Sequence, residues 1–415
     1  MEHWYDGWDE KVLPNETLDE YGQIINTETK KGFGQPDKTP LLPTVRKYDH
    51  PTVNKLREYL RVNNKGIHGL EMCEPHEIDK AASIFHRDGF VVVKNLLTKE
   101  QCTEWKNACD LVLKDILAYP GQEGRRFTGE TGRLHGRYSY GTSSASRQML
   151  HNEIWAKNVA LPTIIPLIER MYGSYIITGA GGDLCIPGAF EYQHLHRDAL
   201  PRGEPEFKGK MAIRRMNEAI KLGLLKLKKD QNTPDDLTLN QKRLISEMMP
   251  MTGTINFVIS DLTFENGPIR QIPGTHTNVQ YAPTTGDEPE FMRLSTCAGV
   301  PAGSGIFRDH RCWHGATPNV SNQVRHMPNI EWQAGWVLGE TTKFNGRIPK
   351  TMPYDIWEQL SPYAKNVCRH VVCKKGVKPT GAGIMHPLAS KRREIFNKMS
   401  VNTNEKSADE FGSKL

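Results

Sequence analysis

Residues 191–200 read EYQHLHRDAL and place a histidine and an aspartate two positions apart. Successive side chains of a strand point to opposite faces, so His196 and Asp198 would share one face. Two histidines and one carboxylate form a facial triad that binds ferrous iron and leaves coordination positions open. The segment 307–319, FRDHRCWHGATPN, offers His314 as the second histidine. Because the chain has 15 histidines, the HxD tripeptide alone is weak evidence, and other features have to support the predicted iron site.

The composition is typical of a soluble globular protein. The chain has 415 residues, of which 37% are hydrophobic and 25% charged, enough for one large domain with additions or for two domains. No run of about 18 apolar residues exists, so no membrane span is expected. The acidic start, MEHWYDGWDE, lacks the apolar core of a secretion signal. The eight cysteines form no CxxC pair and are expected to be reduced thiols.

Two further features concern partners and location. The net charge of +6 mildly favours anionic partners, but no nucleic-acid-binding motif accompanies it, so nucleic acid is not an expected partner. The chain finishes Ser413-Lys414-Leu415, which matches the peroxisomal address that an import receptor reads. We therefore expect import into the peroxisome, and a cytoplasmic location otherwise.

Hydrophobic periodicity predicts helices in the first half of the chain, at 51–63, 74–88, 98–117 and 155–172. The third of these begins with a capping box, Thr98 followed by Gln101. The centre of the chain consists of short β-branched segments separated by glycine and proline turns, from about 175 to 337. This order predicts a mainly β fold with flanking helices, of the α+β class, built as a double-stranded β-helix or jelly roll.

Three parts are expected along the chain: an N-terminal arm with a short helix (1–74), a jelly-roll domain (75–345), and a C-terminal helical extension with a flexible tail (346–415). Within the domain, residues 199–250 form a helical, basic insertion. A solvated helix face is the ordinary explanation of such a charge run. The alternative is a basic lid over a phosphate-bearing substrate.

Residues 121–147 hold five arginines in a segment rich in glycine and serine, which predicts a loop or a loose strand. The segment is either a solvated surface loop or a pocket wall that receives an anionic group. In the second interpretation Arg137, Tyr138 and Tyr140 would contact the substrate.

Four motifs occur in order along the chain: GFVVVKNLLTKEQC (89–102), HRD (196–198), ENGPIRQIPGTH (265–276) and WHGATPN (313–319). Together they resemble the phytanoyl-CoA dioxygenase (PhyH) family of iron(II)- and 2-oxoglutarate-dependent oxygenases, over roughly residues 75–340. The resemblance implies that the HxD pair and His314 hold the iron. It also implies a jelly-roll fold.

The resemblance further implies a place for 2-oxoglutarate. Arg325, eleven residues after His314, would bind the far carboxylate through its guanidinium fork, which lysine cannot copy. A hairpin turning at 318–322 would place His314 and Arg325 opposite each other on one face. Three polar residues are further candidates for co-substrate contact: Gln193, Asn256 and Thr317. Asn256 would either hydrogen-bond the keto acid or enlarge the pocket.

The implied reaction uses Fe(II), 2-oxoglutarate and O2, with ascorbate as a possible reductant, to hydroxylate an unactivated C–H bond of a small molecule. Desaturation or oxidative cyclisation are alternative outcomes. The peroxisomal address, the basic insertion and the family name slightly favour an acyl-CoA substrate. A small, carboxylated molecule tailored in specialised metabolism is the alternative, and a non-catalytic jelly-roll binding protein is a minor one.

Overall fold

The structure is a computed structural model that describes residues 16–18, 24–26, 48–117, 136–143, 148–189, 191–199, 209–278, 280–284, 286–337, 348 and 350–377. Most of the arginine-rich segment and the C-terminal Ser-Lys-Leu lie outside these residues. Predictions about them therefore stay predictions.

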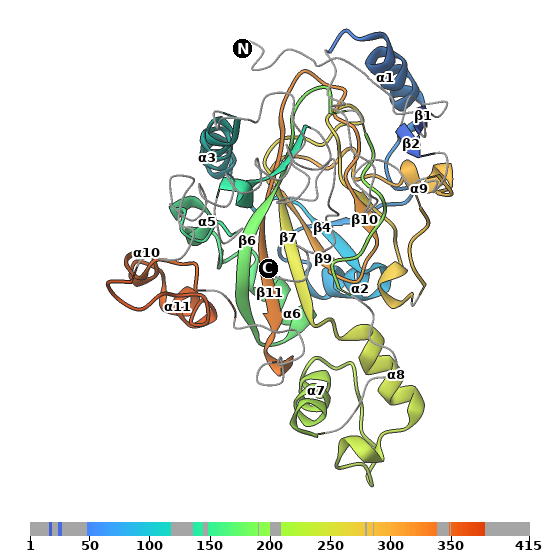
Figure 1. Ribbon diagram of the computed structural model, residues 1–415. Helices are drawn as coiled ribbons and strands as arrows, with labels where there is room; N and C mark the ends of the chain where they lie inside the picture. The colour runs from blue at the N-terminus through green and yellow to red at the C-terminus, as the bar shows by residue number, and fades with distance from the viewer. Residues whose placement is uncertain are drawn as a thin grey trace, which may run out of the picture.

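A seven-stranded sheet with the order β3-β4-β9-β7-β11-β6-β5 forms the centre of the molecule (Figure 1). Its strands are β3 (Met72–Cys73), β4 (Phe90–Val93), β5 (Arg137–Ser139), β6 (Tyr175–Cys185), β7 (Thr252–Val258), β9 (Ser304–Asp309) and β11 (Arg325–Ala334). All neighbours are antiparallel except β3 and β4. The long strand β11 lies between β6 and β7, so both of its edges are paired.

A second, smaller layer lies across the cavity from this sheet. In it β8 (Arg270–Gln271) pairs antiparallel with β10 (His314–Gly315). Single bridges extend the layer, from His314 to His196 on one side and from Arg270 to Thr296 on the other. Along the chain the segments pass back and forth between the two layers, as in a double-stranded β-helix. The predicted jelly roll with flanking helices is therefore confirmed.

Helices cover the outer face of the large sheet: α2 (Ile78–Asp88), α3 (Lys99–Leu117), α5 (Glu153–Lys157) and α6 (Ile165–Tyr172). Their apolar side chains form the main core together with the sheet residues that point outward, among them Ile330 and Trp332. The predicted capping box is present, since the Gln101 N–H donates to Thr98 Oγ1 at 3.2 Å and the Thr98 N–H donates to Gln101 Oε1 at 2.8 Å.

The single helix predicted over 155–172 is wrong. Helix α5 ends at Lys157 and α6 begins only at Ile165. Pro162 lies in the gap, and proline both lacks an N–H donor and disfavours helical backbone in the residue before it. The hydrophobic period continues through this gap because Leu161 and Ile164 are still buried in the core.

The remaining helices lie around the ends of the sheet. Helix α1 (Pro51–Asn63) packs on Val320 in the loop after β10. Helices α7 (Gly209–Lys221) and α8 (Leu239–Met248) belong to the basic insertion and extend below the sheet in Figure 1. The other short elements are β1 (Glu16–Leu18), β2 (Ile24–Asn26), α9 (Glu290–Arg293), α10 (Tyr354–Glu358) and α11 (Pro362–Val367). Among the described helices, none has the length and apolar character needed to cross a bilayer.

Two arginines, the buried Arg215 and the half-buried Arg311, anchor the end of the insertion close to the metal-site loop. Arg215 of α7 donates to the carbonyl oxygens of Ile245, Ser246 and Met249 at 3.2 Å, where the negative end of the α8 dipole favours a cation. Arg311, which lies between β9 and β10, donates to the Ser246 carbonyl at 2.9 Å. These contacts fix the point at which the chain re-enters the sheet as β7.

Candidate metal centre and substrate pocket

A cavity of ≈ 450 Å³ lies between the two layers. Strand β11 lines it with alternate residues, Arg325, Met327, Asn329 and Glu331, as the two-residue period of a strand requires. The intervening His326 points the other way, where its Nε2 lies 2.8 Å from Asp110 of α3. One face of β11 therefore forms a wall of the pocket, and the opposite face packs against the helices that cover the sheet.

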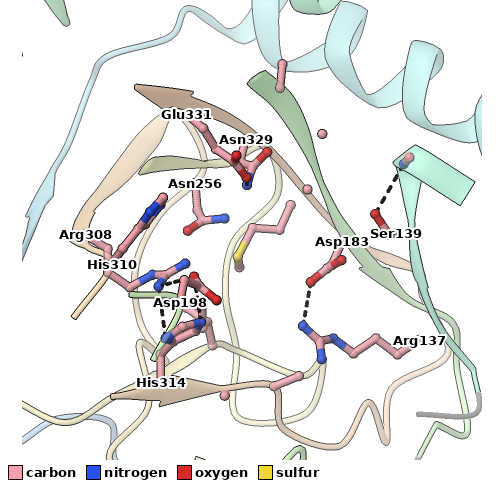
Figure 2. Close-up of a pocket in the computed structure, with 18 of the residues that line it drawn as sticks. Arg137, Ser139, Asp183, Asp198, Asn256, Arg308, His310, His314, Asn329 and Glu331 are labelled. Carbon is pink, nitrogen blue, oxygen red and sulfur yellow. Dashed lines mark hydrogen bonds and ion pairs between the residues drawn. The ribbon is translucent and has the colours of Figure 1, made fainter. Parts of the chain in front are cut away.

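The three predicted metal ligands come together at one side of this cavity, where Figure 2 labels Asp198 and His314. His196 Nε2 lies 3.7 Å from Asp198 Oδ1, and His314 Nε2 lies 3.4 Å from Asp198 Oδ2. One ligand atom from each residue falls within 4.8 Å of the other two, close enough for a single ion to contact all three. The carboxylate is 37% exposed, so the side facing the cavity stays open to further ligands.

Each histidine is oriented by a backbone carbonyl two residues before it. Nδ1 of His196 lies 3.1 Å from the oxygen of His194, and Nδ1 of His314 lies 3.1 Å from the oxygen of Cys312. In the tautomer that carries its proton on Nδ1, each ring donates to that carbonyl and turns the lone pair of Nε2 toward Asp198; in His314 this leaves Arg308 Nη1, 3.0 Å from Nδ1, as a neighbour and not as a hydrogen-bond donor to the ring. This is the arrangement by which proteins fix histidine ligands to metals.

The protonation states also suit a divalent cation. Burial lowers the pKa of His196 to about 4 and lowers that of His314 well below its usual value, so both rings are neutral at neutral pH. Burial alone would raise the pKa of Asp198, but His314, Arg308 and His196 outweigh it and hold this pKa well below its usual value. Neutral imidazoles and an ionised carboxylate are the forms that bind metals. The residues present therefore fit an iron(II) ion.

Arg308 on β9 is a functional residue that the sequence analysis missed. Its side chain is buried, and its Nη1 lies 2.8 Å from Asp198 Oδ2 and 3.0 Å from His314 Nδ1 (Figure 2). A hydrogen bond from arginine to one carboxylate oxygen leaves Oδ1 for a cation. The arginine in FRDH was visible in the sequence, but its place beside the triad depends on the pairing of β9 with β7, which no motif shows.

Arg325 is 2% exposed and lines the same cavity. Its Nε donates to the Gly267 oxygen at 3.0 Å, its Nη1 to the Asp183 oxygen at 3.3 Å and its Nη2 to Cys185 Sγ at 3.1 Å. A guanidinium has five N–H donors, so two remain, one on each Nη. Within the described part of the chain, no carboxylate side chain forms an ion pair with Arg325.

The predicted hairpin between His314 and Arg325 is wrong. His314 is in β10, which pairs with β8 in the small layer, and Arg325 is in β11, which pairs with β6 and β7 in the large sheet. The two strands cross from one layer to the other instead of pairing, as successive strands of a jelly roll do. The two residues still line one cavity, but from opposite walls.

The three other co-substrate candidates differ in position. Asn256 lines the cavity from β7. Gln193 and Thr317 are buried outside the lining: Gln193 Oε1 accepts from the Ala316 N–H at 3.1 Å, and the Thr317 hydroxyl donates to the Pro268 oxygen at 2.6 Å. Both side chains hold the loop after His314, so a direct contact with 2-oxoglutarate remains a prediction for each.

Of the three predicted substrate residues, only Arg137 lines the cavity. It pairs with Asp183 at 2.5 Å, as Figure 2 shows. Tyr138 is next to it on β5 and therefore faces the opposite side, and Tyr140 is buried against Trp155 with its hydroxyl 2.7 Å from His326 Nδ1. Neither tyrosine lines the cavity, so the prediction that they contact substrate there is not supported by their positions.

A lid over the substrate was one of two predicted roles for the basic insertion, residues 199–250. In the described part of the chain, none of its residues lines the cavity. Lys226, Lys228 and Lys229 are exposed, which agrees with the ordinary solvated face.

The Phytanoyl-CoA dioxygenase (PhyH) family model matches residues 239–327, which include His314 and Arg325. The match confirms the resemblance to this family of iron(II)- and 2-oxoglutarate-dependent oxygenases. The match supports an enzyme of the dioxygenase type, in which His196, Asp198 and His314 are residues that could hold a metal ion. The HxD pair lies outside the matched segment, and its place in the site rests on the geometry above.

Several solved structures are similar in fold. SnoN, an epimerase in complex with Fe3+, alpha ketoglutarate and nogalamycin RO, is 17% identical over 62% of this chain and 84% of its own, with a TM-score of 0.39. HygX from Streptomyces hygroscopicus, with nickel, 2-oxoglutarate and hygromycin B bound, is 10% identical over 62% and 87%, with a TM-score of 0.37. Similarity at this level carries no argument about the substrate. No curated protein matches the chain.

Proposed function

We propose that this enzyme oxidises a C–H bond of a small, polar molecule, with its metal on His196, Asp198 and His314 and its 2-oxoglutarate on Arg325. The observation that carries the proposal is the convergence of three ligand atoms within 4.8 Å in a cavity that Arg325 also lines. Iron(II) supplies the activation of O2 and the oxidative decarboxylation of the keto acid to succinate.

The residues of the chain supply orientation and charge. Arg308 holds Asp198 so that one oxygen faces the metal position. The two remaining N–H donors of Arg325 match the two oxygens of a carboxylate, a bidentate contact that would fix the far end of the keto acid. His196 and His314 are each oriented by the carbonyl two residues before them, so the metal position is prepared before any ligand enters.

The pocket wall favours a polar substrate over a fatty acyl chain. Besides the triad and Arg325, the lining includes Arg137, Asp183, Arg308, Asn329 and Glu331, whereas Ile269 and Met327 are its only large apolar residues in the described part of the chain. An acyl chain gains about 0.8 kcal/mol for each CH2 group only where the wall is apolar. This reverses the slight preference for acyl-CoA that the sequence suggested. Peroxisomal import remains a prediction and is compatible with either substrate.

Succinate release tests the proposal. The protein is supplied with Fe(II), 2-oxoglutarate, O2 and ascorbate, and then with a panel of polar metabolites and a panel of acyl-CoA esters. We expect the polar panel to stimulate succinate formation and the Asp198→Ala variant to form none.

Stimulation by acyl-CoA esters alone, lost at high salt or on neutralising Lys226, Lys228 and Lys229 of the insertion, would favour the acyl-CoA alternative. A protein that binds no 2-oxoglutarate would be a binding module instead.

A further inference from the structure

Strand β11 carries a second polar group further along the cavity from Arg325. Asn329 and Glu331 share the cavity face of this strand, and Asn256 on β7 is the direct cross-strand partner of Asn329. Figure 2 shows Asn256 beneath the Asn329–Glu331 pair, on the side of the cavity toward Asp198. The three side chains therefore surround one region of the pocket, next to the metal position.

This region presents three side-chain oxygens as hydrogen-bond acceptors, two from amides and one from the Glu331 carboxylate. Asn329 Nδ2 donates to Glu331 Oε1 at 3.4 Å, which turns the Asn329 amide oxygen away from the carboxylate. That oxygen is buried without a partner, and so is the amide oxygen of Asn256, whose side chain is 7% exposed. Buried polar atoms in native proteins are nearly always hydrogen-bonded, so a ligand that donates is the simplest partner for both.

The charges in the cavity single out Glu331. Arg137 pairs with Asp183, and Arg308 pairs with Asp198. Arg325 is the anchor assigned above to 2-oxoglutarate. Among the described residues, no lysine or arginine forms an ion pair with Glu331; its neighbours in the cavity are the Asn329 amide and the His310 ring. A carboxylate left in a pocket without a counter-charge favours a cationic ligand.

We propose that Asn256, Asn329 and Glu331 form a subsite for a protonated primary amine of the substrate. An ammonium group has three N–H donors and no acceptor, which matches three oxygen acceptors, and its contact with Glu331 is a charge-assisted hydrogen bond. A hydroxyl offers one donor, and a carboxylate or phosphate is repelled by Glu331. The subsite rests on the proposed function because it lies in the cavity of the metal centre. It assigns Asn256 to the substrate and not to the keto acid.

Matched probe pairs test this subsite in the full chain loaded with Zn(II) and 2-oxoglutarate, which does not turn over. The pairs are glucosamine with glucose, and 1,4-diaminobutane with 1,4-butanediol, and binding is measured by ligand-observed NMR. We expect the amine of at least one pair to bind about tenfold more tightly than its alcohol, since a hydrogen bond to a charged group contributes about 1.5–3 kcal/mol. Glu331→Gln removes the preference, whereas Glu247→Gln, an exposed change on α8, keeps it. Asn256→Leu weakens amine binding and leaves the Kd of 2-oxoglutarate unchanged.

The outcomes separate this inference from the proposed function. If the protein binds 2-oxoglutarate but prefers the amine in neither pair, or if Glu331→Gln keeps the preference, the subsite is refuted and the proposed function stands. If Asn256→Leu weakens 2-oxoglutarate binding instead, Asn256 serves the co-substrate and the three-residue subsite is wrong. A protein that binds no 2-oxoglutarate overturns both proposals.

Discussion

Replacing Arg325 gives the sharpest test of the co-substrate site. Three of its five N–H donors are used by neutral acceptors on β6 and at Gly267, and two remain for a carboxylate. Hydrogen bonds to charged groups contribute about 1.5–3 kcal/mol each, so Arg325→Met should weaken 2-oxoglutarate binding by about 3 kcal/mol or more. That is a loss of more than about a hundredfold in Kd. Arg325→Lys keeps the charge but loses the fork, and we expect a loss of about tenfold.

The assay compares thermal or chemical unfolding of the metal-loaded protein with and without 2-oxoglutarate, under anaerobic conditions. At a concentration of 100 times the wild-type Kd, the ligand stabilises the native protein by about 2.7 kcal/mol, and a hundredfold weaker Kd reduces this to about 0.4 kcal/mol. Isothermal calorimetry gives the Kd directly. Arg243→Met, an exposed arginine change on α8, is the matched control and should keep the full stabilisation.

Wild-type affinity for 2-oxoglutarate in Arg325→Met would refute the assignment. A variant that also fails to bind Co(II) would instead show that the substitution disturbs the whole site. The metal measurement is therefore made on the same preparation.

Three further predictions concern the metal and the fold. His314→Ala removes one of the three proposed metal ligands, and the Co(II) affinity measured by titration should fall at least about a hundredfold. Even residues that only hydrogen-bond to a metal ligand contribute about 10–100-fold to metal affinity. An unchanged affinity would exclude His314 as a ligand. Glu288→Gln leaves the fully buried Arg270 without its partner and should lower the free energy of unfolding in urea by about 3–5 kcal/mol; a loss below about 1 kcal/mol would contradict this. Burial raises the pKa of Asp110, but hydrogen bonds from His326 and Lys106 outweigh it and lower this pKa to about 2. The resulting stabilisation is complete above about pH 4 and is lost as pH falls toward 2, so Asp110→Asn should flatten the pH dependence of unfolding in that range.

The helices and long strands could be predicted from the sequence because they are long enough to show a period. The helix at 51–63 and the capping box at Thr98 are present as predicted. The small layer could not be predicted in the same way, since β8 and β10 have two residues each and the rest consists of single bridges. A strand of two residues shows no alternation of apolar and polar side chains. The sequence therefore predicted a hairpin between His314 and Arg325 instead of two strands in different layers.

The convergence of His196, Asp198 and His314 could be predicted because the HxD spacing and the distal histidine are local features with a chemical meaning. Arg308 and Glu331 carry no such motif, and their role depends on which strands become neighbours. Strand β9 reaches the triad only because it pairs with β7, and Glu331 reaches the cavity only because β11 lies on the other edge of β7. The positions of Tyr138 and Tyr140 relative to the cavity could not be predicted because the phase of β5 was unknown, and a shift of one residue exchanges the pocket face for the core face.

The single unbroken strand β11 also fixes the distance between Arg325 and Glu331. Arg325 and Glu331 are six residues apart on it, about 20 Å at 3.3 Å per residue, and no loop or hinge lies between them. Strand β6 pairs with the whole of this span and β7 with its part from Asn329 onward, so the distance between the two side chains is held fixed. A substrate that binds Glu331 must therefore span a fixed distance to bring its reacting C–H bond to the metal position. A new substrate specificity would arise by substituting shorter or longer side chains at the cavity-lining positions of β11, while the proposed contact between Arg325 and the keto acid is kept.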